Sequence, residues 1–172
     1  MMMNKFKLIV GLGNFGEKYQ RNRHNLGFII LDNYIYPEKY EYNSKNNSYI
    51  FKKDGIIFAK PKSYMNTSGE EVSKLCSYFQ VSPSELLVIH DDLDIDFGKL
   101  KLQSGSSDAG HNGVKDIIRA LGTKDFYRLR FGIGRPLNEN MPIDSYVLSD
   151  FLPNEIEDIK KFDLNQYLNS HL

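Results

Sequence analysis

The uninterrupted apolar run LLVI at residues 86–89 constrains the fold of this chain more than any other feature. A strand with one face in water alternates apolar and polar residues, whereas a short continuous run is typical of a strand covered on both faces. Strands of this kind belong to sheets that have a layer of helices on each side. The run therefore favours an α/β fold over an all-β or all-helical one.

Strand and helix patterns alternate along the rest of the chain, as an α/β fold requires. We expect a twisted, mixed but mostly parallel sheet with helices on both faces, in a single domain that covers residues 1–172. The mixed character is expected because Asp54-Gly55 forms a turn between two neighbouring strands. The other strands are expected at 6–11, 48–53, 55–60, 98–103 and 127–134, and the helices at 25–35, 67–79, 111–121 and 153–162.

Length and composition are typical of a globular protein that does not enter membranes. The 172 residues suit one domain of about 150 residues or slightly more. No apolar run approaches the ~20 residues of a membrane helix, and the first residues lack the apolar stretch of a signal peptide. The single cysteine, Cys76, rules out an intrachain disulfide, so we expect a cytoplasmic protein with Cys76 in its core.

The charges balance overall but are unevenly distributed. The chain has 22 basic and 22 acidic residues. Seven of the acidic residues but only two of the basic ones follow Arg135, so residues 1–135 carry an excess of five positive charges. A basic body is compatible with a nucleic-acid ligand, although solvated surface lysines produce the same balance.

The stretch GLGNFG at residues 11–16 matches the glycine pattern of dinucleotide-binding loops. In those proteins a helix begins at the third glycine, and its N-terminus binds the pyrophosphate. Here Gly16 precedes EKYQRNRHN, which is polar and lacks helical periodicity. The acidic residue expected about 20 positions further on is also missing, since Asp32 falls inside the next predicted helix. A nucleotide-binding oxidoreductase is therefore a weak hypothesis.

Polar residues follow several of the expected strands. Asn14 follows the first strand, Asn66 follows the strand that ends near residue 60, and Asp91 follows LLVIH, while His24 lies in the loop after Asn14. Parallel neighbouring strands would bring these side chains to one rim, where open α/β sheets bind ligands. An imidazole oriented by a carboxylate is a general base, and amides polarise a carbonyl. The alternative is local: Asn66 and Asp91 serve turns, and His24 caps a helix.

Two further histidines have structural interpretations. His90 precedes Asp91 in the same strand and should point to the opposite face of the sheet. His111 and Asn112 stand at the start of a predicted helix, and that position explains them without a catalytic role. The sequence has no Cys/His cluster that indicates a metal, and it predicts no cofactor.

Five motifs follow one another in order between about residue 7 and residue 152: GLGN followed by RHNLGF, KPKSYMNTSG, HDDLDIDFGKLKL, GHNGVKDII and RLRFGIGRP. Together they closely resemble the motifs of the bacterial peptidyl-tRNA hydrolase family, and several ordered motifs are far more specific than one. The chain departs from the family where Phe15 replaces a usual proline, Asn22 replaces a usual threonine and the loop at 104–110 is poorer in glycine.

The resemblance implies an α/β monomer, without cofactor or obligate protein partner, that hydrolyses the ester between a peptide and the 3′ ribose of tRNA. It implies that His24 is the general base, that Asp91 orients it and that Asn14 senses the acylated state of the substrate. It also implies that Asn66 and Asn112 hold the peptide and the tRNA 3′ end. The remaining implied contacts are Tyr19, Tyr64 and Met65 in the lining of the site, and Lys101, Lys115 and Arg130 at tRNA phosphates.

Two alternatives accompany this hypothesis. An RNA-binding protein could keep the fold and lose the activity, but His24, Asp91, Asn14 and Asn66 are all present, which argues against that alternative. The nucleotide-binding oxidoreductase is the second. Arg130 has an alternative of its own, because an arginine inside a strand could simply pair with a neighbouring acid.

Overall fold

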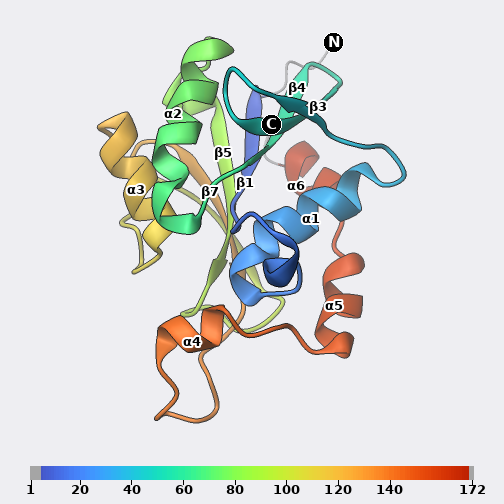
Figure 1. The fold of residues 1–172 in the computed structure, drawn as a ribbon, viewed down its shortest axis with the longest axis vertical. Coiled ribbons are helices and arrows are strands. Elements are labelled where there is room, and N and C mark those ends of the chain that lie inside the picture. Colours follow the sequence, from blue (N-terminus) through green and yellow to red (C-terminus); the bar gives the residue numbers. More distant parts are fainter. Residues whose placement is uncertain (1–4, 171–172) are drawn as a thin grey trace.

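The structure is a computed structural model that describes residues 5–170, and a seven-stranded sheet forms its centre (Figure 1). The order of the strands across the sheet is β2-β3-β4-β1-β5-β7-β6. The strands are β1 (Leu8–Gly11), β2 (Glu41–Asn43), β3 (Ser48–Lys53), β4 (Ile56–Pro61), β5 (Leu86–Asp92), β6 (Leu100–Ser104) and β7 (Tyr127–Gly132).

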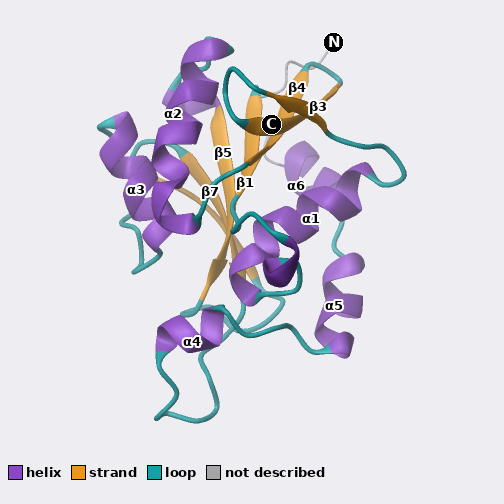
Figure 2. Ribbon diagram, in the orientation of Figure 1, coloured by secondary structure: helices purple, strands orange, loops and turns teal. Residues whose placement is uncertain are grey.

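Helices cover both faces of the sheet (Figure 2). The helices α2 and α3 lie on one face, and α1, α5 and α6 lie on the other. None of the helices within residues 5–170 is long and apolar enough to cross a membrane. Their bounds are α1 (Leu26–Ile35), α2 (Ser68–Tyr78), α3 (Asn112–Leu121), α4 (Ile143–Val147), α5 (Pro153–Lys160) and α6 (Leu164–Ser170).

The side chains of β5 alternate between two hydrophobic cores, one on each face of the sheet. Leu86 and Val88 pack in the core under α2 and α3, while Leu87 and Ile89 pack in the core under α1 and the C-terminal helices. Every residue of β5 is buried. This arrangement confirms the interpretation of LLVI as a strand covered on both faces, and with it the α/β fold.

The sheet is mixed, as expected, and its parallel pairs are at the centre. β1 pairs in parallel with β4 and β5, and β5 pairs in parallel with β7. Both edges are antiparallel, through the β2–β3, β3–β4 and β6–β7 pairs. The predicted predominance of parallel pairing therefore holds for the four central strands, whose carboxyl ends meet at one rim.

Among the strands and α-helices of residues 5–170, β2, α4 and α6 were not predicted from the sequence. The strand β2 has three residues and lies at the edge of the sheet, and α4 has five residues. In α6, Leu164 and Leu168 are buried against the rest of the chain. Short elements of this kind are stabilised by tertiary packing more than by local propensity, so their sequences carry little periodic signal.

The glycines of GLGNFG have a packing role that replaces the rejected dinucleotide interpretation. A Cβ on Gly11 would lie 2.5 Å from the carbonyl oxygen of Gly27, so the two glycines let α1 approach β1 closely. Gly16 has a φ of 125°, which favours glycine. A 3₁₀ turn (Glu17–Tyr19) follows, and α1 begins only at Leu26. No α-helix therefore begins at Gly16 to meet a pyrophosphate.

Candidate active site

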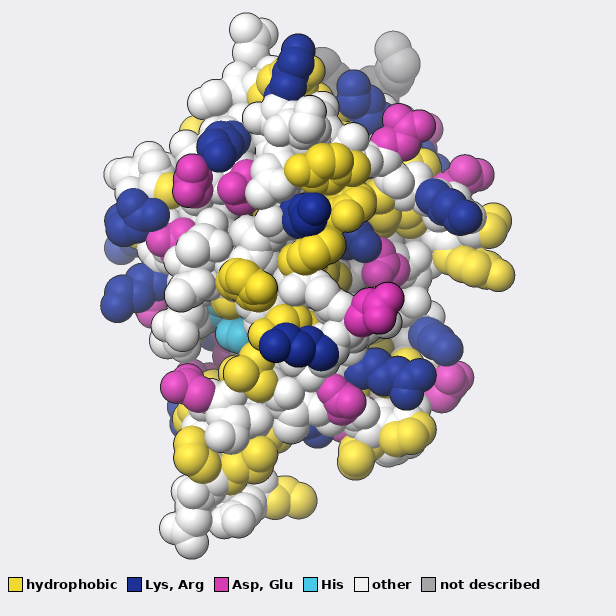
Figure 3. Space-filling model, viewed as in Figure 1, with side chains coloured by type: hydrophobic (Ala, Val, Ile, Leu, Met, Phe, Trp, Pro, Cys, Tyr) yellow, Lys and Arg dark blue, Asp and Glu magenta, His cyan; other side chains and the backbone are white. Residues whose placement is uncertain are grey.

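The candidate site lies at the rim where the carboxyl ends of β1 and β5 meet. Asn14 follows β1, and Asp91 is the sixth residue of β5. His24 lies in a 3₁₀ turn (Arg23–Asn25) that leads into α1, and His111 precedes α3. In the space-filling view a histidine side chain is visible at the bottom of a hollow in the surface (Figure 3).

Asp91 accepts hydrogen bonds from two histidines that come from distant parts of the chain. Its Oδ2 lies 2.9 Å from Nδ1 of His24, and its Oδ1 lies 2.9 Å from Nε2 of His111. The centres of the two imidazole rings are 4.8 Å apart. All three residues are buried, so the carboxylate holds both rings in fixed orientations.

The hydrogen bonds of this cluster determine which nitrogens carry protons. Nδ1 of His111 accepts the backbone N–H groups of Gly113 and Val114, at 3.1 and 3.3 Å, so its proton is on Nε2 and is donated to Asp91. An ionised carboxylate only accepts, so Nδ1 of His24 must also donate to Asp91. Nε2 of a neutral His24 is then an acceptor, which is the form a general base needs.

The same contacts set the pKa values of the cluster. Burial raises the pKa of Asp91, but the charges and hydrogen bonds of His24 and His111 outweigh burial and hold that pKa well below its usual range. Burial lowers the pKa of His24, but Asp91, with a smaller contribution from Asp144, outweighs burial and raises that pKa from its usual value. The carboxylate of Asp91 therefore favours the imidazolium that forms when His24 accepts a proton.

His90 is buried next to this cluster without joining it. Its Nδ1 lies 2.8 Å from the backbone oxygen of Asp91, and its ring packs edge-on against His111 with centres 4.7 Å apart. Burial, with a smaller contribution from the charge of His111, lowers the pKa of His90 to about 3, so this ring stays neutral. These contacts support the structural interpretation of His90.

Asn14 is held by hydrogen bonds to both its side chain and its backbone. Its Oδ1 accepts the backbone N–H of Met65 at 2.7 Å. Asn25 binds both backbone groups of Asn14, accepting its N–H at 2.8 Å and donating to its carbonyl oxygen at 2.9 Å. Because Oδ1 is occupied, Nδ2 is the side-chain atom of Asn14 that remains to donate to a ligand.

The other residues predicted for the lining of the site differ in exposure. Met65 is buried, whereas Tyr64 is 57% exposed. The rings of Tyr64 and Tyr19 lie edge-on with centres 6.3 Å apart. Asn66 is exposed in the turn before α2, and Asn112 is exposed as the first residue of α3.

A small hollow of about 40 Å³ opens beside His24 and Asp91. A water molecule occupies about 30 Å³ in the liquid, so the hollow has room for one next to the proposed base. Its other walls come from the end of β5, the start of α3 and α4: Asp92, Leu93, Ala109, Gly110, His111, Asn112, Ile143, Asp144 and Val147.

Of the three basic residues predicted to meet RNA, two lie on the paired strands β6 and β7, and the third lies on α3. Lys101 on β6 and Lys115 on α3 are exposed. Arg130 on β7 pairs with the buried Asp92, with 2.8 Å between Nε and Oδ2, and donates to Gln103 at 2.5 Å. Arg130 thus makes an ion pair of the kind that the structural alternative expects, and part of its guanidinium is engaged inside the chain.

Several residues that support the site were not predicted from the sequence. His111 was assigned only to a helix start, and Asn25 was not singled out. Arg23, the neighbour of His24, joins the 3₁₀ turn to the C-terminal segment through Glu155 at 2.9 Å. Its guanidinium also lies 4.7 Å from the ring centre of Tyr146. The tripeptide RHN carries no periodic signal for such contacts, because all of their partners are remote in sequence.

The residues with metal-binding side chains that come together within residues 5–170 are His24, Asp91 and His111. Their candidate ligand atoms lie within 4.8 Å of one another. The distances of 2.9 Å from Asp91 to each histidine are those of hydrogen bonds, and the proton positions derived above account for every one of these atoms. Hydrogen bonding is therefore sufficient to explain the cluster.

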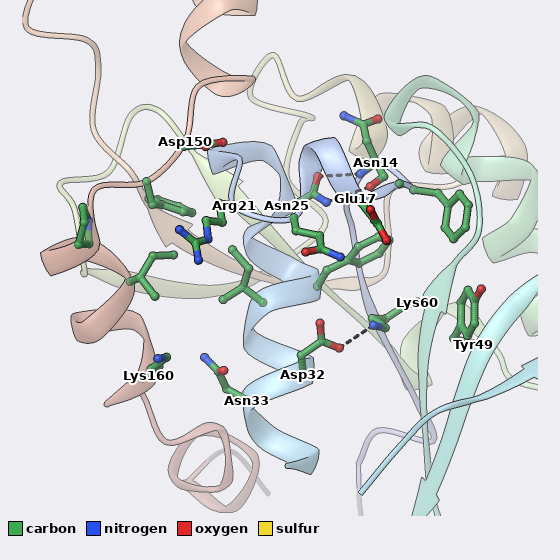
Figure 4. A pocket seen from close by; sticks show the side chains of 18 of the residues that line it. Asn14, Glu17, Arg21, Asn25, Asp32, Asn33, Tyr49, Lys60, Asp150 and Lys160 are labelled. Carbon is green, nitrogen blue, oxygen red and sulfur yellow. Dashed lines mark hydrogen bonds and ion pairs between the residues drawn. The ribbon is translucent and has the colours of Figure 1, made fainter. Parts of the chain in front are cut away.

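A larger hollow of about 820 Å³ starts at Asn14 and Phe15 and extends over the outer side of α1. One wall is α5 and the other includes Tyr49 and Lys60, whose ammonium pairs with Asp32 at 2.6 Å (Figure 4). No residue of this hollow other than Asn14 was predicted as functional.

The sequence and fold are similar to those of known peptidyl-tRNA hydrolases. The peptidyl-tRNA hydrolase family profile matches residues 8–169. The chain is 42% identical over 160 residues to peptidyl-tRNA hydrolase 1 of Corynebacterium glutamicum, which covers 92% of this chain and 90% of that protein. It is 42% identical over 154 residues to peptidyl-tRNA hydrolase of Mycobacterium tuberculosis, covering 86% and 80%. The crystal structure of peptidyl-tRNA hydrolase from Acinetobacter baumannii matches with a TM-score of 0.80 at 30% identity, over 98% of this chain and 86% of that one.

Proposed function

The chain belongs to the peptidyl-tRNA hydrolase family and is a peptidyl-tRNA hydrolase, and we propose that His24, Asp91 and Asn14 carry out its reaction. The bond hydrolysed is the ester between the peptide and the 3′ ribose of tRNA. The observation that carries this assignment is the 2.9 Å hydrogen bond from Nδ1 of His24 to Oδ2 of Asp91. It leaves Nε2 of His24 as an acceptor next to a hollow with room for water.

His24 acts first as a base and then as an acid. Nε2 removes a proton from water, and the water oxygen attacks the acyl carbon, so the carbonyl becomes an oxyanion. When this intermediate collapses, the bond to the 3′ oxygen of the ribose breaks, and that oxygen takes the proton from Nε2. Asp91 stays ionised throughout and stabilises the imidazolium of His24.

Asn14 recognises the blocked amino group of the substrate. Its Nδ2 donates a hydrogen bond to a carbonyl oxygen of the peptide, which a free aminoacyl group lacks. The aminoacyl group presents an ammonium instead, and an amide N–H cannot bond to it. Asn66 and Asn112 hold the peptide and the 3′ end, and the site is lined by Tyr19, Tyr64 and Met65.

The tRNA part of the substrate binds on the side of the sheet that carries β7 and β6. Lys101, Lys115 and Arg130 are the proposed phosphate contacts. Such contacts supply affinity that falls as the salt concentration rises. Arg130 differs from the other two because it has to share its guanidinium with Asp92.

Hydrolysis in ¹⁸O-labelled water tests this mechanism directly. Attack of water on the acyl carbon places one ¹⁸O atom in the carboxylate of the released peptide and none in the tRNA, which mass spectrometry of both products detects. Label in the tRNA would contradict it. The wild type and His24→Ala should be compared on the same N-blocked substrate, with Lys99→Ala, a change at an exposed surface ion pair, as the control.

All groups proposed for the reaction come from one chain, which supports action as a monomer. Sedimentation at working concentrations checks this, and a concentration-dependent specific activity would argue against it. We also place the enzyme in the cytoplasm, because its substrate is a product of translation. Cell fractionation with an antibody against the chain tests the location.

A further inference from the structure

At the rim next to Asn14, two aromatic rings lie against one lysine, and the ring of Tyr49 lies next to both of them. We call Phe15, Tyr42, Tyr49 and Lys62 the aromatic–lysine patch. Nζ of Lys62 lies 4.9 Å from the ring centre of Phe15 and 5.2 Å from that of Tyr42. Phe15 is 39% exposed and Tyr42 is 47% exposed. Figure 3 shows hydrophobic side chains gathered around a basic side chain on this face, over β3 and β4.

The patch is held in place by hydrogen bonds beneath it. The backbone N–H of Lys62 donates to the carbonyl oxygen of Asn47 at 2.9 Å, and Nδ2 of Asn47 donates to the carbonyl oxygen of Lys62 at 3.0 Å. The hydroxyl of Tyr42 donates to Oδ1 of Asn47 at 2.7 Å. The rings of Phe15 and Tyr49 are nearly parallel, with centres 6.2 Å apart. A surface that is already ordered loses little entropy when it binds.

The ammonium of Lys62 has no carboxylate partner among residues 5–170. Lys60, two residues earlier, differs because it pairs with Asp32 at 2.6 Å. The faces of the rings stabilise the charge of Lys62 without neutralising it. The patch therefore offers an unpaired cation and apolar area side by side, which suits an acidic side chain with an apolar stem or neighbour.

The order of the strands places the patch on the opposite side of the catalytic centre from the proposed RNA contacts. Its residues lie on β2 and β3 and just after β4 and β1, whereas Lys101 and Arg130 lie on β6 and β7. β1 and β5, which position Asn14 and Asp91, lie between the two sets. The tRNA and the peptide leave the scissile ester in opposite directions, so if the tRNA covers β7 and β6, the peptide extends over β4, β3 and β2.

From this arrangement we propose that the aromatic–lysine patch binds the part of the peptide remote from the ester and favours peptides with Asp or Glu there. The proposal rests on the proposed function for the position of the ester. The larger hollow shares Phe15 and Tyr49 with the patch, so space for several peptide residues continues beyond it. Lys62 pairs with the acidic side chain, and the rings pack against the residues next to it.

Three substrates with one tRNA and one ester-linked residue test the proposal. The first carries an N-acetylated single residue, the second an N-acetylated pentapeptide with two Glu residues, and the third the same pentapeptide with Gln. Wild type should have a higher kcat/KM for the Glu peptide than for the Gln peptide. Lys62→Ala should lower kcat/KM for the Glu peptide about two- to fivefold, the range of an exposed ion pair, and Lys62→Glu should lower it further. Neither change should affect the single-residue substrate.

Lys52→Ala is the matched control. Lys52 is an exposed lysine near the other end of β3, and its Nζ lies 5.4 Å from the ring centre of Phe79. This variant should have the same kcat/KM as wild type for each of the three substrates. The proposal would be overturned if Lys62→Ala lowered kcat/KM equally for all three substrates. It would also be overturned if the decrease in kcat/KM depended on the salt concentration but not on the charge of the peptide. Either result would show an RNA contact. If wild type failed to cleave even the single-residue substrate, the proposed function itself would be at fault.

Discussion

His24 and Asp91 are 67 positions apart in the sequence, yet Nδ1 of one lies 2.9 Å from Oδ2 of the other in a buried hydrogen bond. The parallel pairing of β1 with β5 creates this contact, because it brings the loop after β1 to the carboxyl end of β5. The bond orients the imidazole and raises the pKa of His24 despite its burial. Changes to the two residues should therefore affect the reaction in different ways.

Removing the base should stop most of the chemistry. We expect His24→Ala to lower kcat by on the order of 10²-fold or more, which is the usual contribution of a general base. The fold should persist, because Asp91 keeps its hydrogen bond from His111. Steady-state kinetics and thermal melting measure the two effects. Near-wild-type turnover by a folded variant would exclude His24 as the base.

Removing the charge of Asp91 should lower activity and shift its pH dependence. The carboxylate favours the imidazolium and raises the pKa of His24, so in Asp91→Asn that pKa should fall. The base is active when neutral, so the acidic limb of the kcat/KM profile should move to lower pH, while the maximum falls because the ring is less well oriented. An unchanged limb would show that the two residues are not coupled.

Two substitutions of His111 separate its roles at Asp91 and at the start of α3. His111→Asn keeps a side chain that caps the helix but loses the donor to Asp91, whereas His111→Ala loses both. Turnover should fall in both variants, and by less than in His24→Ala. The Ala variant should be less stable to unfolding than the Asn variant by about 1 kcal/mol, the cost of a lost cap. Full turnover of His111→Asn would mean that its bond to Asp91 does not assist the reaction.

Asn14→Asp tests the amide donor with little change in shape. Oδ1 of the new side chain still accepts the N–H of Met65, but Nδ2 is replaced by an oxygen that cannot donate. We expect kcat/KM for the N-blocked substrate to fall by about 10- to 100-fold, because a peptide carbonyl left without its donor costs about 1–3 kcal/mol. Thermal melting checks that the fold remains. Unchanged kinetics would show that Nδ2 of Asn14 does not contact the substrate.

Lys101→Ala and Arg130→Ala should differ, although both residues are proposed RNA contacts. Each should reduce the dependence of substrate binding on salt by a slope of about one per lost phosphate contact. Arg130→Ala should also lower the melting temperature, because it leaves the buried carboxylate of Asp92 without its partner. Lys101 is exposed, so Lys101→Ala should leave the melting temperature unchanged.

A minimal ester substrate without most of the tRNA is the control for both basic residues. Lys101→Ala should cleave it as wild type does. If both variants lose activity equally on long and short substrates and the salt slope stays the same, these residues act on the fold and not on RNA.

The local sequence was enough to predict the α/β fold, because apolar periodicity reports which faces of a strand or helix are buried. The run at 86–89 predicted the first four residues of β5, which continues to Asp92, and the helix predicted at 111–121 begins one residue later. The ordered motifs also predicted the family and the residues proposed for catalysis. The glycine loop was correctly separated from dinucleotide binding, since no helix follows Gly16 directly.

Only the tertiary structure decided how the predicted residues are connected. The second histidine at Asp91, the double hydrogen bond of Asn25 to Asn14 and the engagement of Arg130 by Asp92 each join residues from different elements. Sequence periodicity describes which side of an element is buried, but it does not contain the distance between two elements. That distance is set by strand pairing and by close packing such as the contact of Gly11 with Gly27, and these contacts give His24 both its orientation and its raised pKa.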